Sequence, residues 1–284
     1  MRLRMAAPLA AALFAGWAAM PARTQAVAPL RPAFADAVCN ARPPAISHAW
    51  ARGIEGVQPG RVIPVATTFS NEDNADLLFK LGLLEGHLMV GRELIAAGNP
   101  TLALPHFGHP VRELYDDISA PLRERGVTGF DMELVALEAL AAAKPGDPAF
   151  VAKYNEVIGI VTAARATVPQ ALQGDPRFMA GVYADLAEIA AGDYNESIEA
   201  GRITKPVEYH DSRGYLAYAS RSLDALLARP DLAGNTRLLT VRREITDMQT
   251  VVGSLIPPER PRASAAAYRA LAGKIRATSR AADA

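Results

Sequence analysis

Residues 77–95, LLFKLGLLEGHLMVGRELI, decide the fold class of this chain, because apolar or small residues recur there at helical spacing. One stripe runs from Leu77 to Ile95 in alternating steps of four and three, and a second stripe passes through His87. Polar side chains are so few in this stretch that we expect a central helix, covered on most sides. The sequence Gly98-Asn99-Pro100 ends it.

Beyond this helix, proline and glycine divide the chain into further segments with helical periodicity. The expected helices cover residues 110–125, 131–143, 148–167, 176–191, 206–229 and 236–254, with a last helix from residue 263. We therefore predict an all-α fold over residues 71–284, either a helical bundle or stacked αα-hairpins, with seven to eight helices. Short internal matches allow one further interpretation, in which residues 73–125 and 176–229 are duplicated hairpin halves.

The N-terminal 26 residues predict a secretory signal peptide. Arg2 and Arg4 precede an apolar run over residues 6–20, and small residues follow up to Ala26. The run is shorter than the roughly 20 residues that a bilayer-spanning helix needs. We expect a periplasmic or secreted protein with no integral membrane segment after cleavage. Residues 27–70, rich in Pro and Ala, predict an extended arm with one short edge strand over residues 62–66.

Composition excludes several classes of partner. Thirty acidic residues balance thirty basic ones, so no basic excess exists for binding nucleic acid or for docking on anionic lipid. The single cysteine, Cys39, cannot form an internal disulfide, and the fold must be held by its core.

Three of the five histidines fall close together, between Glu85 and Glu113. Imidazole and carboxylate side chains together suit a transition metal, and this mixture fits Zn, Fe, Cu or Mn without choosing among them. The candidate metal ligands are His87, His109, Glu113, Glu85 and His106.

Helix geometry predicts which of these candidates lie level with one another along the helix axis. A rise of about 1.5 Å per residue, with a reversal after the first helix, puts Glu85, His87, His109 and Glu113 at one height. His106 would lie nearer the turn. In the expected connection, a short helix ends near residue 105 and a new helix starts at residue 110, which leaves His106 in a loop and His109 as the helix cap.

Other roles for these residues compete with metal binding. The histidines would be structural if each donated a hydrogen bond to a buried carboxylate or to the backbone, with Glu85 paired to a buried cation. A hydrolase would need an activated nucleophile, and no Gly-x-Ser-x-Gly elbow is present, so we expect a binding protein rather than an enzyme. Residues 208–211 could bring a second ligand set to the same site, although alone they are typical of a solvated helix start. The tyrosines over 183–218 are typical of core packing.

The leading prediction is a helical protein that binds a transition metal, or a ligand held through one, for uptake, storage or resistance. The alternative is a non-catalytic helical scaffold that binds a protein or peptide partner in the cell envelope. The expected architecture resembles that of iron-related periplasmic proteins of the imelysin kind. Their Gly-x-His-x-x-Glu motif is not reproduced, because Gly108 directly precedes His109 and Glu113 comes one residue late, so the resemblance is one of architecture alone.

Overall fold

The computed structural model describes residues 68–282, and these residues form the predicted all-α bundle. The signal peptide, Cys39, the arm up to residue 67 and the expected strand over 62–66 lie outside the described residues. The elements are α1 (Asn71–Ala96), α2 (Pro100–Ala103), α3 (Pro105–His109), the π-helix η1 (Pro110–Leu114), α4 (Tyr115–Glu124), α5 (Asp131–Ala143), α6 (Pro148–Arg165), α7 (Gln170–Gln173), α8 (Pro176–Glu196), β1 (Ile198–Glu199), β2 (Arg202–Ile203), α9 (Pro206–Leu227), α10 (Thr236–Val251) and α11 (Ala265–Arg280).

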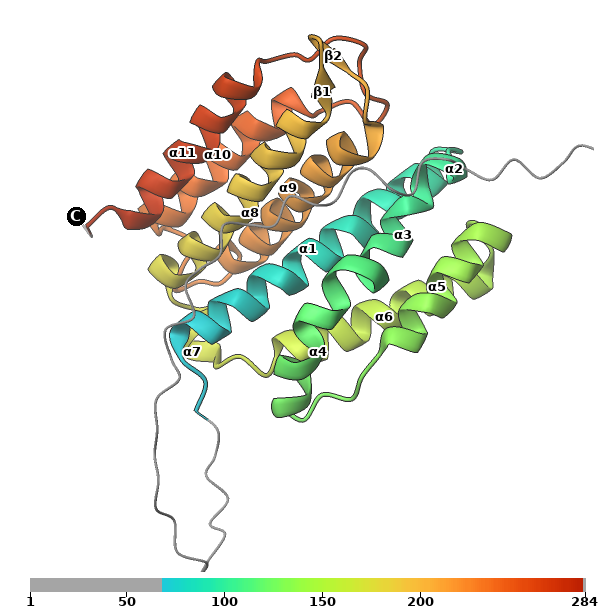
Figure 1. Ribbon diagram of the computed structural model, residues 1–284. Helices are drawn as coiled ribbons and strands as arrows, with labels where there is room; N and C mark the ends of the chain where they lie inside the picture. The colour runs from blue at the N-terminus through green and yellow to red at the C-terminus, as the bar shows by residue number, and fades with distance from the viewer. Residues whose placement is uncertain (1–67, 283–284) are drawn as a thin grey trace, which may run out of the picture. The chain divides into compact units, whose positions relative to one another are not determined.

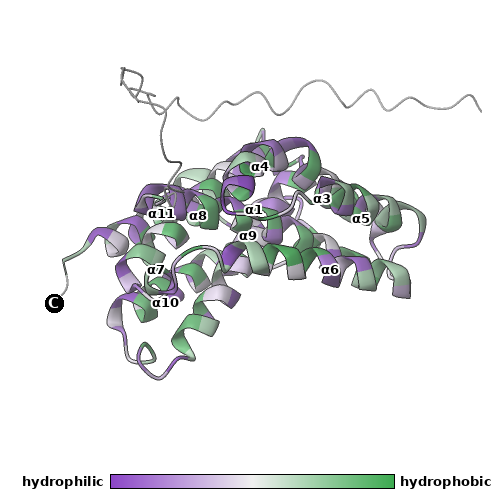
Figure 2. Ribbon diagram, turned by 90° about the horizontal axis from the view of Figure 1, so that it is seen from below, coloured by the Kyte–Doolittle hydropathy of each residue, from purple (hydrophilic) through white to green (hydrophobic). Residues whose placement is uncertain are grey.

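Helix α1 lies between two groups of helices (Figure 1). On one side α8, α9, α10 and α11 pack as a four-helix bundle, in which α9 and α11 each contact α8 and α10. On the other side α3, α5 and α6 form a smaller group, and α1 contacts both α3 and α6. Most helices carry hydrophobic and hydrophilic bands along their length, as expected of helices that bury one face (Figure 2).

The sequence at both ends of α1 explains its length. Ser70 accepts a hydrogen bond from the backbone N–H of Asp73, and the Asp73 carboxylate accepts one from the backbone N–H of Ser70, which forms a capping box. Gly98 ends the helix in the left-handed conformation, with φ +77°. Between these ends Leu81, Leu84 and Leu88 are fully buried, so α1 is the central helix that its sequence predicts.

The expected loop around His106 is wrong, because the chain stays helical there. Leu104, His109 and Pro110 all have right-handed helical backbone angles. Pro110 has no N–H and its ring crowds the carbonyl four residues back, and the wider π-turn of η1 accommodates it. His106 therefore lies inside α3, and His109 is both the last residue of α3 and the N-cap residue of η1, which begins at Pro110 as the sequence predicts.

Helix α8 continues past Gly192, where the sequence predicts its end. Glycine inside a helix costs only about 1 kcal/mol relative to alanine, which packing on both sides offsets. The helix ends at Glu196, and a short hairpin of β1 and β2 follows, with Ala200 and Gly201 both at positive φ in its turn. This extension places Asp193 on α8.

Two glycines let α1 and α9 touch backbone to backbone. A Cβ atom at Gly214 would lie 2.4 Å from the carbonyl oxygen of Gly86. The contact brings the residues beside Gly86 against the first turns of α9.

None of the helices within residues 68–282 has the length and hydropathy that crossing a bilayer would require.

Candidate metal centre

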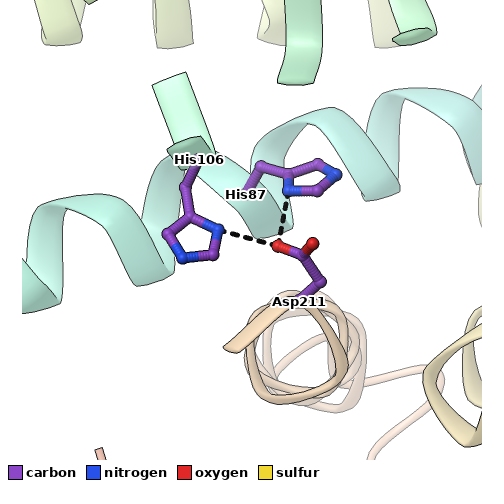
Figure 3. Close-up of side chains that lie close together, drawn as sticks. All are labelled: His87, His106 and Asp211. Carbon is purple, nitrogen blue, oxygen red and sulfur yellow. Dashed lines mark hydrogen bonds and ion pairs between the residues drawn. The ribbon is translucent and has the colours of Figure 1, made fainter. Parts of the chain in front are cut away.

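His87, His106 and Asp211 meet where α1, α3 and α9 converge (Figure 3). His87 follows Gly86 at the close contact of α1 with α9, and Asp211 projects from the second turn of α9. Each of the three residues offers one ligand atom, and these atoms lie within 4.8 Å of one another. We call these three residues the His–Asp site.

Both imidazoles of the site lie next to the same carboxylate oxygen, Oδ1 of Asp211. Nδ1 of His106 donates a hydrogen bond of 2.7 Å to Oδ1 of Asp211. Nδ1 of His87 also lies 2.7 Å from this oxygen. All three residues are buried, and the side chain of His106 is 0% exposed. Because water cannot solvate these groups, each must be satisfied by the protein or by an ion.

The surroundings of the site favour a neutral imidazole at His106 beside an ionised carboxylate at Asp211. Burial by itself raises the pKa of Asp211, but His87 and His106 outweigh it and hold this pKa well below its ordinary value. Burial lowers the pKa of His106 more than Asp211 raises it, so its imidazole is neutral near pH 7. Neutral imidazole and ionised carboxylate are the forms that bind metals.

His109 lies at the rim of the site. Its Nδ1 is 3.5 Å from Oδ2 of Asp211, and its Nε2 is 3.9 Å from Oε1 of Glu113 one turn on. The side chains are 18% and 39% exposed, respectively, in contrast to the buried centre. Burial lowers the pKa of His109, but Asp211 and neighbouring carboxylates outweigh it and raise this pKa above its ordinary value. His109 could complete a coordination shell from the solvent side.

Two imidazole nitrogens of the His–Asp site are buried and have no hydrogen-bond partner among the described residues, Nδ1 of His87 and Nε2 of His106. The close approach of His87 to Asp211 lacks the alignment of a hydrogen bond. Unpaired buried nitrogen atoms are unfavourable unless another group binds them. Two nitrogens and one oxygen make a donor set that suits Zn, Fe, Cu or Mn. The residues present therefore fit a transition metal.

The outer nitrogen of His87 is held by a tyrosine. The hydroxyl of Tyr215 lies 2.8 Å from Nε2 of His87, and both groups are buried. A hydrogen bond on one ring nitrogen decides which tautomer the imidazole adopts and how its ring is oriented. When Nε2 carries the proton and donates to the tyrosine oxygen, the lone pair of Nδ1 faces Asp211.

Glu85 lies apart from this site and is engaged elsewhere. Its carboxylate is buried and forms ion pairs with Arg165 and Arg221. Residues two apart on a helix point to different sides, which separates Glu85 from His87. The structure thus brings together His87, His106 and His109, places Glu113 at the rim, and keeps Glu85 out of the group.

Asp211 and Tyr215 are not among the five ligands that the sequence predicts. Asp211 enters only through the segment 208–211, a possible second ligand set, and the structure does bring this residue to the histidines. Asp211 is separated from His106 by 105 positions, so neither helical spacing nor a motif links them. His210, next to it, instead donates from Nε2 to the carbonyl of Leu255 over 2.9 Å.

A comparison with protein families matches residues 169–283 to the iron permease-associated 4-helix bundle domain. Curated proteins and solved structures gave no match. The matched segment is less than half of the chain and contains α8, α9, α10 and α11, the four helices that pack as a bundle. Asp211 and Tyr215 thus lie in a segment similar to that iron permease-associated domain, whereas His87, His106 and His109 precede it.

Proposed function

We propose that this protein binds a transition metal ion at the His–Asp site and serves in iron transport at the cell envelope. His87 binds through Nδ1, His106 through one ring nitrogen and Asp211 through its carboxylate, with His109 available at the rim. The observation that carries the proposal is the convergence of two buried imidazoles on one carboxylate oxygen, each at 2.7 Å.

Distances support the fit. Two ligand atoms about 2.1 Å from one ion lie about 3 to 3.5 Å apart in a tetrahedral site. Each nitrogen is now 2.7 Å from the oxygen, so shifts of less than about 1 Å open the space that an ion needs. At His106 the ion takes the place of the proton that Nδ1 now donates to Asp211.

Iron is the favoured ion because the domain that matches residues 169–283 is described as iron permease-associated. We infer that the partner is a metal-transporting permease in the membrane, and that this chain delivers the ion to it or receives the ion from it. The signal peptide expected over residues 1–26 supports a periplasmic or secreted location.

Metal titration of the full mature chain tests the proposal. The chain is stripped with a chelator and titrated anaerobically with Fe²⁺, and in parallel with Zn²⁺ and Mn²⁺, by calorimetry. We expect the wild type to bind the ion, and His87→Gln and Asp211→Asn each to weaken the affinity by more than the roughly 10–100-fold that is typical when a residue hydrogen-bonded to a ligand is replaced. The control Asp117→Asn changes an exposed carboxylate on α4 and should bind as the wild type does.

Circular dichroism and thermal unfolding confirm that each variant is folded before the titration is interpreted. Absence of binding by the wild-type chain would overturn the proposal, as would equal affinity in Asp211→Asn. Those results would instead favour the helical scaffold with structural histidines. In cells, His87→Gln should lower iron accumulation as much as deletion of the chain does.

A further inference from the structure

A second group of potential ligands adjoins the His–Asp site. Asp193 on α8 and Glu208 in the first turn of α9 each offer a carboxylate oxygen to one point near Asp211, and the three ligand atoms lie within 4.8 Å of one another. We call Asp193, Glu208 and Asp211 the carboxylate group. Asp211 therefore belongs to both groups, with its two oxygens available to different neighbours.

The carboxylate group lacks an ion pair to a lysine or arginine within residues 68–282, although Lys205 and His109 act on Glu208 at longer range. Neither Asp193 nor Glu208 is within ion-pair distance of a lysine or arginine in that part of the chain. Adjacent carboxylates in a partly buried place are unfavourable unless protons or a cation neutralise them.

A second observation, independent of the acidic residues, also points to a ligand. Nδ1 of His87 is buried, has no hydrogen-bond partner in the described structure and points at Asp211, 2.7 Å away. A nitrogen without a hydrogen bond, on His87, and two carboxylates without an ion pair, on Asp193 and Glu208, therefore lie next to the same residue, Asp211.

We propose that the chain holds a second metal ion, bound by Asp193, Glu208 and Asp211, and that the Asp211 carboxylate bridges it to the ion of the His–Asp site. The inference rests on the proposed function. Helical bundles support such pairs of ions because carboxylates from facing helices project inward, and ions that share a bridge lie about 3.5–4 Å apart.

The two positions differ in donors and in access. Three oxygens favour a harder ion such as Mn²⁺ or oxidised iron, whereas two imidazoles favour a softer divalent ion. Asp193 and Glu208 are half-buried, whereas His106 is fully enclosed. An ion arriving from solvent meets the carboxylate group first, so this position loads before the inner one.

Counting bound ions tests the inference, with Mn²⁺ as the probe because it is stable in air and paramagnetic. The stripped full chain is saturated with Mn²⁺, and native mass spectrometry counts the ions per chain. We expect two for the wild type, one for the double variant Asp193→Asn/Glu208→Gln, and two for the control Asp117→Asn, which changes an exposed carboxylate on α4.

The outcomes separate the two proposals. One ion in both the wild type and the double variant overturns the second position and leaves the His–Asp site standing. No ion in the wild type overturns both. One ion in His87→Gln, retained at the carboxylate group, supports two distinct positions.

Electron paramagnetic resonance tests the bridge itself. Two Mn²⁺ ions joined by Asp211 are spin-coupled, so the wild type should lack the six-line spectrum of an isolated ion. The double variant, with one ion, should show that spectrum. A wild-type chain that holds two ions and still gives the six-line spectrum at full intensity would overturn the bridging role of Asp211.

Discussion

Nδ1 of His87 on α1 lies 2.7 Å from Oδ1 of Asp211 on α9, and the backbones of the two helices touch beside this contact. The contact exists because Gly86 and Gly214 carry no side chains at the crossing. The geometry of the candidate metal centre therefore depends on how closely two helices approach, as much as on the ligands themselves.

A methyl group at the crossing should separate the helices. In Gly214→Ala the new Cβ would meet the carbonyl oxygen of Gly86, which belongs to the backbone and cannot move aside. We expect a loss of about 1–3 kcal/mol in the free energy of unfolding, measured by urea denaturation. Metal affinity should fall as well.

The matched control for that variant is Gly159→Ala, on the exposed side of α6. A Cβ at Gly159 meets no atom within 4 Å, so alanine should stabilise the chain by roughly 0.5–1 kcal/mol. Equal effects of the two substitutions would contradict the role of the crossing.

Glu85 should matter for stability but not for metal binding. Glu85→Gln leaves Arg165 and Arg221 without their buried carboxylate, at a cost of about 1–3 kcal/mol by urea denaturation. Metal affinity by calorimetry should stay within about twofold of the wild type, because residues two apart on a helix point to different sides. Glu93→Gln, which breaks an exposed ion pair with Arg213, should cost no more than about 1 kcal/mol. A large loss of metal affinity in Glu85→Gln would return Glu85 to the ligand set.

The hydroxyl of Tyr215 should orient the imidazole of His87. Tyr215→Phe removes the hydrogen bond at Nε2 and should weaken metal affinity about tenfold. Nitrogen NMR of the metal-free chain should show a changed tautomer for His87. Tyr218→Phe, one turn away on the same helix, serves as the control and should change neither measurement. Unaltered NMR shifts of His87 in Tyr215→Phe would show that the hydroxyl does not set the tautomer.

His210 should make the metal-free chain sensitive to acid. Burial, with the neighbouring His106, lowers the pKa of His210 from 6.5 to about 4. Above pH 6.5 the imidazole is neutral in both the folded and unfolded chain, and its contribution to stability is complete. As pH falls from 6.5 to about 4, the unfolded chain takes up a proton that the folded chain does not. The free energy of unfolding should therefore fall by roughly 2–3 kcal/mol over this interval.

His210→Gln isolates this contribution. The variant lacks the titrating group, so the difference in unfolding free energy between wild type and variant should shrink as pH falls from 7.5 to 4. Denaturation curves in a chelator at several pH values measure it. A difference that stays constant with pH would exclude His210 as the source.

The all-α fold could be predicted from the helical periodicity of the apolar residues and from the glycine and proline residues between the periodic segments, because both signals are local to each helix. Helix α5 has the predicted bounds, from Asp131 to Ala143. The failures occurred where packing overrode local preference. Pro110 is accommodated by a π-turn that no spacing rule predicts, and Gly192 lies inside α8 because the helix is supported along its length.

The candidate site was predicted in part. His87, His106 and His109 were identified because they lie close in the sequence, and the structure brings them together. Asp211 and Asp193 come from distant helices, and local patterns do not say which distant side chains will meet. The roles of His87, His109, Glu113, Glu85 and His106 in binding metal stay predictions until the titrations are done.

The separation of His106 and Asp211 by 105 positions has a consequence for biosynthesis. An N-terminal segment that emerges first carries the imidazoles, but the carboxylate that they require is made much later. A growing chain therefore cannot assemble the three residues of the His–Asp site before Asp211 has been made. Under the proposed function, products truncated before Asp211 should not bind the ion at this site.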